Sequence, residues 1–210
     1  MKKHKHYFLL NLDLDGRKCL VIGGDDEALE KMERLLECDA EITLVSPKIL
    51  PEIKKLSGDG KIKHIHRKYE SGDEEEMYFV LNCVKTDPEM SDTLFKNCVR
   101  QHILISSYDQ SQYSTATMAA LVRAGDKVRI SISTGNTSPA VARKLRMELE
   151  KLLDEKFARF VDWIVAYRDK LEEDSVPPSE RKKFFREFME DFKISGACVY
   201  PEEFERKQPE

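Results

Sequence analysis

The sequence predicts an α/β fold with three parts: a Rossmann-like parallel sheet domain, a small α+β domain and a C-terminal helical domain. Three observations predict it. A short apolar strand at residues 19–22 leads into Gly23-Gly24 and then a helix, which is how a dinucleotide-binding βαβ unit begins. Strands and helices alternate from there to about Asp109. Beyond Ala140 the chain is helical in pattern and rich in charge.

The glycine turn departs from the usual dinucleotide-binding pattern, G-x-G-x-x-G/A, at one position. Gly23 supplies the first glycine and Ala28 the closing small residue. Asp25 stands where the second glycine normally lets the backbone approach a pyrophosphate. A carboxylate adds bulk and negative charge at that point. The turn therefore predicts the fold more strongly than it predicts the cofactor.

Apolar periodicity defines the elements of the first domain. It predicts strands at 17–22, 41–45, 62–67, 77–84 and 102–106, and helices at 26–36 and 91–101. Parallel sheets of this kind bind ligands at the carboxyl ends of their strands. The residues expected at those ends are Gly23, Ser46, Lys85 and Ser106.

The pattern changes after Tyr113. Residues 116–124 are interpreted as a helix or mixed segment, and residues 128–133 alternate as an antiparallel strand with an edge that a second copy would cover. The polar loop Ser133-Thr-Gly-Asn-Thr-Ser-Pro139 then precedes a long helix. It can bind an anion through backbone N–H groups, cap the helix through Ser138, or do both.

The remainder is predicted to form amphipathic helices whose apolar stripes face a core. A break at Val176-Pro-Pro-Ser179 separates the last helix from the one before it. The tail after Ala197 is expected to be weakly ordered.

Composition excludes several functional classes. With 35 Lys and Arg against 39 Asp and Glu, the net charge of −4 argues against nucleic-acid binding by phosphate neutralisation. Neither a membrane-length apolar run nor a signal-peptide core is present in the sequence, and the scattered cysteines favour a reducing cytoplasm. His64 and His66 share one face of a strand, but the surrounding Lys and Arg favour a solvated basic strand, so no metal site is predicted.

Four motifs resemble, in order and spacing, the precorrin-2 dehydrogenase/sirohydrochlorin ferrochelatase family, the stand-alone form of the amino-terminal half of siroheme synthase. They are Val21-Ile-Gly-Gly24, Ala40-Glu-Ile-Thr-Leu-Val-Ser-Pro47, Ile132-Ser-Thr-Gly-Asn-Thr-Ser-Pro-Ala-Val-Ala-Arg-Lys-Leu-Arg-Met-Glu-Leu-Glu150 and Glu180-Arg-Lys-Lys-Phe-Phe185. The resemblance implies a Rossmann-like NAD-binding domain at 1–112, a dimerisation domain at 113–149 and a helical domain at 150–210. It further implies a cytoplasmic homodimer that oxidises the tetrapyrrole precorrin-2 to sirohydrochlorin with NAD. Some members also insert ferrous iron to give siroheme.

The resemblance also implies roles for individual residues. Asp109 would be catalytic, because a carboxylate can accept a proton as hydride leaves the macrocycle or as a metal enters it. Its other interpretation is a turn residue in Tyr108-Asp-Gln-Ser111. The expected cofactor-binding residues are Gly23, Gly24, Asp26, Glu27, Ser46, Pro47, Lys48 and Thr86. The expected substrate-binding residues are Ser133, Thr134, Gly135, Asn136, Ser138, Arg143 and Arg146, with Lys144 adding positive charge.

Departures from the family keep two other functions open. Asp25 replaces a family glycine, Glu27 a usual valine and Glu30 a usual arginine, so negative charge surrounds the pyrophosphate position. A chelatase-only enzyme, or a tetrapyrrole-binding module without redox chemistry, would tolerate these changes. Retention of Asp109 and of the 133–139 loop favours an active tetrapyrrole site.

Overall fold

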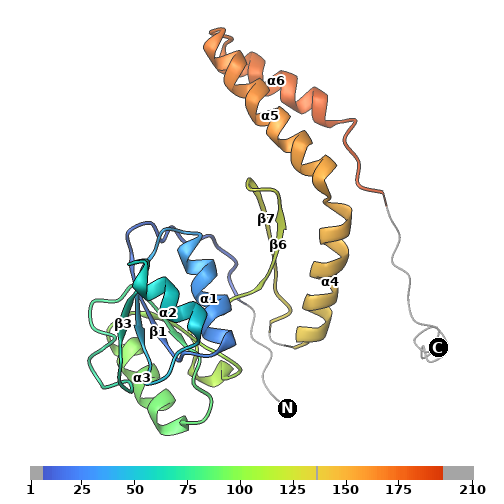
Figure 1. The fold of residues 1–210 in the computed structure, drawn as a ribbon. Helices are drawn as coiled ribbons and strands as arrows, with labels where there is room; N and C mark the ends of the chain where they lie inside the picture. Colours follow the sequence, from blue (N-terminus) through green and yellow to red (C-terminus); the bar gives the residue numbers. More distant parts are fainter. Residues whose placement is uncertain (1–6, 136, 196–210) are drawn as a thin grey trace, which may run out of the picture. The chain divides into compact units, whose positions relative to one another are not determined.

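The computed structural model describes residues 7–135 and 137–195. They belong to two compact units (Figure 1). One takes in the chain up to Val122 together with Ser131–Glu148, and the other takes in Arg123–Ile130 and the chain from Leu149 onward. The division into three domains at residues 112 and 149 stays a prediction. The tail after Ala197 lies outside the described residues.

The described part of the first unit contains a five-stranded parallel sheet, which confirms the predicted Rossmann-like fold. Its strands are β1 (Lys18–Ile22), β2 (Glu41–Val45), β3 (Lys63–Ile65), β4 (Phe79–Asn82) and β5 (Leu104–Ser107). Their order in the sheet is β3-β2-β1-β4-β5. The chain moves outward from β1 to β3, then returns to pair β4 with the other side of β1. The order therefore reverses between β1 and β4, and ligands of such sheets bind at the carboxyl ends of the strands beside this reversal.

Helices cover both faces of the sheet. α1 (Asp26–Leu36) and α2 (Pro51–Gly58) pack on one face and α3 (Pro88–Arg100) on the other (Figure 1). Successive residues of β1 enter the two cores, because Val21 lies in one cluster with Met32 of α1 and Leu20 in the other with Leu94 of α3. Burying each of these large side chains stabilises the fold by about 2 kcal/mol. Coverage on both faces explains why the inner strands are mostly apolar.

Two elements differ from the sequence-based expectation. Periodicity did not predict α2, because this short helix buries a single side chain, Ile53. The prediction of a helix or mixed segment at 116–124 is wrong, since β6 (Ala120–Ala124) pairs with β7 (Val128–Ile132) in a hairpin. The alanines of this segment favoured a helix. Gly125, at φ +63°, makes the turn, and a glycine turn between two apolar stretches is a hairpin signal.

The later helices confirm the predicted helical pattern and the proline break. They are α4 (Pro139–Leu152), α5 (Glu155–Glu173) and α6 (Pro178–Met189). The prediction that their apolar stripes face a core is wrong, because Val141, Leu145 and Leu152 are exposed and neither of the last two helices has a buried residue. Aromatic rings join α5 to α6, with the Tyr167 and Phe184 centroids 5.1 Å apart and those of Trp163 and Phe188 5.2 Å apart. None of the described helices combines the length and the apolar character that crossing a membrane requires.

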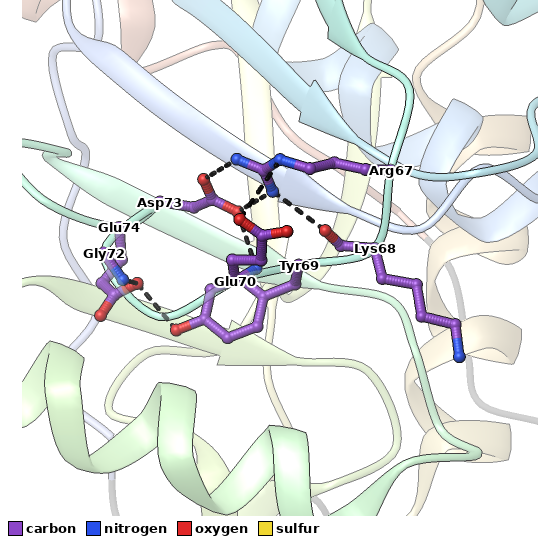
Figure 2. Close-up of polar contacts among 7 residues, drawn as sticks. All are labelled: Arg67, Lys68, Tyr69, Glu70, Gly72, Asp73 and Glu74. Carbon is purple, nitrogen blue, oxygen red and sulfur yellow. Dashed lines mark hydrogen bonds and ion pairs between the residues drawn. The ribbon is translucent and has the colours of Figure 1, made fainter.

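A loop rather than a helix connects β3 to β4, and a polar network fixes its shape (Figure 2). The Arg67 guanidinium donates hydrogen bonds of 2.6 and 2.7 Å to the two carboxylate oxygens of Asp73 and thereby lowers the pKa of that carboxyl. Glu74 is 1% exposed and accepts from the Tyr69 hydroxyl at 2.7 Å and the Gly72 N–H at 3.0 Å. These two donors satisfy a buried carboxylate that would otherwise be costly to desolvate.

Glu74→Ala should lower the free energy of unfolding by about 2–4 kcal/mol, because the Tyr69 hydroxyl and the Gly72 N–H lose their buried acceptor. Glu75→Ala removes the exposed neighbouring carboxylate and should change the free energy by less than about 0.5 kcal/mol. Urea denaturation of both variants measures the difference. Equal effects would show that the network does not stabilise the loop.

Candidate functional site

The candidate site lies at the carboxyl edge of the sheet. We define the carboxyl-edge site by the segments that follow four strands: 23–28 after β1, 46–50 after β2, 83–86 after β4 and 108–110 after β5. Surface hollows of about 380 and 510 Å³ lie instead at the amino edge, around Lys18 and Glu76. The Lys18–Glu76 ion pair there, at 3.1 Å, is well exposed to solvent. Neither hollow contains the residues predicted to bind the cofactor, whereas the carboxyl-edge site contains all of them together with Asp109.

The loop after β2 packs directly onto the glycine turn after β1. A Cβ atom on Gly24 would lie 2.1 Å from the Lys48 carbonyl oxygen and 2.9 Å from Ser46 Oγ. The Leu50 N–H donates to the Gly24 carbonyl at 3.1 Å, and Ser46 Oγ donates to the Lys48 carbonyl at 2.6 Å. Gly24 is therefore required by a close approach of the protein's own backbone.

Gly23 makes the sharp turn from strand to helix. Its φ of +119° lies in a region that other residues rarely adopt, and a Cβ atom there would lie 3.1 Å from Cys83 Cβ. Ala28, the closing small residue of the pattern, lies in α1 and is completely buried in the core beneath the helix. Both positions thus serve the tight turn and the close helix–strand packing that the pattern predicts.

Asp25 caps α1. Its carboxylate accepts the Ala28 N–H at 3.1 Å, and Asp26 and Glu27 follow in the first turn. Negative charge at a helix N-terminus is stabilising. The side chain therefore turns onto the helix end, where backbone N–H groups would otherwise bind a phosphate.

Four side chains from three segments form what we call the Tyr108 cluster: Glu27, Lys31, Lys85 and Tyr108. Lys31 Nζ lies 2.7 Å from a carboxylate oxygen of Glu27, one turn away on α1. The ammonium groups of Lys31 and Lys85 each lie 4.4 Å from the centroid of the Tyr108 ring. The Glu27 carboxylate and the Tyr108 hydroxyl also interact, and each shifts the pKa of the other. The cluster thus joins α1 to the ends of β4 and β5.

Charge in the cluster favours an ionised Glu27 and a neutral Tyr108. Burial opposes ionisation of Glu27, but hydrogen bonds from Lys31 and Tyr108, with the charges of Lys31 and Lys85, outweigh it and lower its pKa. The hydrogen bond to Glu27, followed by burial, raises the pKa of Tyr108 to about 12. Tyr108 is therefore a hydrogen-bond donor throughout the physiological range of pH.

Sequence reasoning named Glu27 as a site residue but not the other three members of the cluster. The spacing of Glu27 and Lys31, four residues apart on a helix, was the available signal for the ion pair. Lys85 was expected at a strand end without a role in the site.

Asp109 lies in the turn after β5, directly beside Tyr108. Its φ is +57°, a left-handed conformation that aspartate tolerates better than most residues. The turn is fixed on both sides, because the Tyr108 N–H donates to the Asn82 carbonyl at 2.8 Å and the Gln110 side chain donates to the Val84 carbonyl at 2.9 Å. Asp109 is thus an exposed turn residue that is also held at the carboxyl-edge site.

The remaining expected cofactor residues lie at the same edge. Pro47, Lys48 and Thr86 are exposed there, whereas Ser46 is buried and its hydroxyl bonds within its own loop. His64 Nε2 lies 2.9 Å from the Ser46 carbonyl oxygen. Among the described residues, no three histidine, cysteine or acidic side chains gather as a metal would require.

The expected substrate residues form a second group on the loop before α4. Thr134 Oγ1 donates to the Ser138 carbonyl at 3.2 Å, and Ser138 Oγ accepts the Val141 N–H at 3.4 Å, as a helix cap does. The Gly135 N–H donates to Ser133 Oγ at 3.3 Å, and Asn136 lies outside the described residues. On α4, the expected basic residues Arg143 and Lys144 are exposed, Arg146 is half-buried, and Lys144 pairs with Glu148 at 2.6 Å.

The buried cysteines are core residues. Burial raises the pKa of the Cys19 thiol to about 11 and those of Cys83 and Cys98 to about 12, so all three stay protonated at neutral pH. Cys83, directly beneath Gly23, is therefore not a nucleophile of the site.

Comparisons with known proteins agree with this fold. A family model described as putative NAD(P)-binding matches residues 10–120. Siroheme synthases from Thioalkalivibrio sulfidiphilus and Pseudoalteromonas translucida are 27% and 28% identical to the chain over 185 and 180 residues. These alignments cover 88% and 85% of this chain, which spans 37% of the length of each relative. The solved structure of SirC, a precorrin-2 dehydrogenase, superposes on this chain with a TM-score of 0.78 and 21% identity. The match covers 88% of this chain and 90% of the SirC chain, and it shows a similar fold. The resemblance inferred from the four motifs is confirmed.

Gly24→Ala should lower the free energy of unfolding by about 1–3 kcal/mol, because the new methyl group would force the Lys48 carbonyl away from the glycine turn. The matched control is Gly58→Ala at the end of α2, where an added Cβ meets nothing within 4 Å and stability should be unchanged or slightly raised. Thermal unfolding followed by circular dichroism compares them. Tolerance of alanine at both positions would contradict the close approach at Gly24.

Proposed function

We propose, since the chain belongs to the putative NAD(P)-binding family, that it oxidises the tetrapyrrole precorrin-2 to sirohydrochlorin with NAD in siroheme biosynthesis. One observation carries the proposal. Tyr108 joins the first turn of α1 to the turn that holds Asp109, so the glycine turn and the candidate base belong to one site. The names of the relatives and of the structural neighbour supply the substrate class.

The residues of the carboxyl-edge site fit a dinucleotide. Gly23 makes the required turn, and the ammonium groups of Lys31 and Lys85 supply positive charge where Asp25 has capped the helix. The residues that would hold the dinucleotide are Gly23, Gly24, Asp26, Glu27, Ser46, Pro47, Lys48 and Thr86. When bound, NAD supplies the hydride acceptor.

Asp109 would accept the proton. Oxidation of precorrin-2 removes two electrons and two hydrogens: one hydrogen leaves with the electron pair as hydride, and the other leaves as a proton to the Asp109 carboxylate. Tyr108, neutral and held by Glu27, would stay a hydrogen-bond donor next to that carboxylate. Asp109 would then release the proton to water, because it is exposed.

The substrate would reach this site from the loop and helix that follow β7. The carboxylates of the tetrapyrrole would interact with Ser133, Thr134, Gly135, Asn136, Ser138, Arg143 and Arg146. In the described residues β7 pairs with β6 alone, so its other edge is open to a strand of a second copy, and we expect a homodimer built there.

A chelatase without redox activity is the second candidate, and Asp25 favours it. Its carboxylate occupies the helix end that a pyrophosphate would otherwise use. In that reaction ferrous iron is the substrate, and Asp109 would take the protons that leave the pyrrole nitrogens as the metal enters. The same site would then serve metal insertion alone.

Asp109→Asn keeps the size of the side chain but removes its basicity, so the rate of sirohydrochlorin formation should fall by about 10²- to 10⁴-fold while ligand binding remains. Asp59→Asn, an exposed aspartate after α2, is the control and should match the wild type. Paired assays follow NAD-dependent oxidation and iron insertion. A wild type active only in iron insertion would support the chelatase, and full activity in Asp109→Asn would leave Asp109 a turn residue.

Asp25→Gly should tighten NADH binding by about 5- to 30-fold, because a negative charge leaves the end of α1 that faces the pyrophosphate. The control is Asp154→Gly, which removes the equivalent cap of α5, where Asp154 accepts the Phe157 N–H at 3.0 Å. Both variants should lose a few tenths of a kcal/mol of stability. Unchanged or weaker NADH binding in Asp25→Gly would refute the expected repulsion.

A further inference from the structure

We propose that Lys31 and Lys85 form the anion subsite of the carboxyl-edge site and bind the pyrophosphate of the dinucleotide in place of the end of α1. The inference rests on the proposed function, since it concerns how the same site holds NAD(P). It assigns a binding role to two residues that the glycine pattern does not contain.

One backbone donor at the usual pyrophosphate position is already engaged within the chain. The Asp25 carboxylate accepts the Ala28 N–H, so the helix end carries a negative side chain of the protein itself. The Lys48 carbonyl fills the space beside Gly24, with its oxygen 2.1 Å from where a Cβ would stand. A dinucleotide therefore needs a second source of positive charge at this edge.

The two lysines supply that charge from separate elements. Lys31 comes from α1 and Lys85 from the segment after β4, and their ammonium groups converge on one aromatic ring. The Lys31 side chain is 13% exposed and is held by Glu27, so its position is set before a ligand arrives. Lys85 is exposed and flanks the same ring, where it can meet a ligand without breaking an ion pair of the cluster.

Acidic neighbours make these ammonium groups necessary for an anionic ligand. The carboxylates of Glu27, Asp109 and Glu30 all raise the pKa of the Tyr108 hydroxyl. The positive charges of Lys31 and Lys85 lower the pKa of Glu27. Because a pyrophosphate brings further negative charge into this setting, removing one ammonium group should cost more affinity here than removing a lysine elsewhere on the surface.

The test is Lys85→Met in the full chain, which keeps the length of the side chain and removes its charge. Fluorescence titration should show NADH binding weakened about tenfold, the size expected for a charge-assisted phosphate contact. Lys85→Arg should restore most of the affinity. Lys61→Met, an exposed lysine near the amino edge of the sheet, is the control and should bind NADH as the wild type does. Circular dichroism checks that all variants are folded.

A second probe identifies the group that is bound. Reduced nicotinamide riboside lacks phosphate, so its affinity should not change in Lys85→Met. Equal loss of affinity for NADH and for the riboside, or a loss of sirohydrochlorin binding with NADH unaffected, would overturn the assignment to pyrophosphate. NADH binding that is the same in wild type and Lys85→Met would overturn this inference alone. Absence of NADH binding in the wild type would overturn it together with the proposed dehydrogenase.

Discussion

The packing of the loop after β2 onto the glycine turn after β1 is the contact on which the carboxyl-edge site depends. The Lys48 carbonyl and the Leu50 N–H both meet Gly24, so the turn is fixed between two neighbouring strands. This fixes the direction in which α1 begins. Because Asp25 caps that helix, its first two turns present Glu27 and Lys31 toward Tyr108. A backbone contact within the sheet thus positions a side-chain cluster at the end of a different strand.

The site shows how one change in a glycine pattern alters the source of positive charge. A helix end stabilises an anion by about 1 kcal/mol or less when exposed, and the Asp25 carboxylate uses that interaction. The Lys31–Glu27 pair, 13% and 33% exposed, is less screened than a surface pair. Tyr108 then brings Lys85 to the same place. We infer that a side-chain anion site replaces a backbone one, built from two lysines that contact the ring of Tyr108, the residue beside Asp109.

The local sequence pattern was sufficient to predict the five-stranded sheet, but it was not sufficient to predict the Tyr108 cluster. The bounds of α1 were predictable because a cap precedes a clear apolar stripe, and the inner strands because they are buried on both faces. The β6 strand was missed because its alanines also suit a helix, and α2 because it buries one side chain. Asp25 could equally have pointed outward, and its role as a cap depends on the angle of the turn. The contact of Lys31 with Tyr108 follows from the strand order, which periodicity does not reveal.

The most direct test of the account maps NADH onto the backbone by amide chemical shifts. The central claim is that a dinucleotide binds at the carboxyl edge beside β1 and β4, although the end of α1 is capped by Asp25. Saturation with NADH should shift the amides of residues 23–28, 46, 48–50, 83–86 and 108–110 together, and leave those at the amino edge, around Lys18 and Glu76, unchanged. Shifts centred on the amino edge, or no saturable shifts at all, would contradict it.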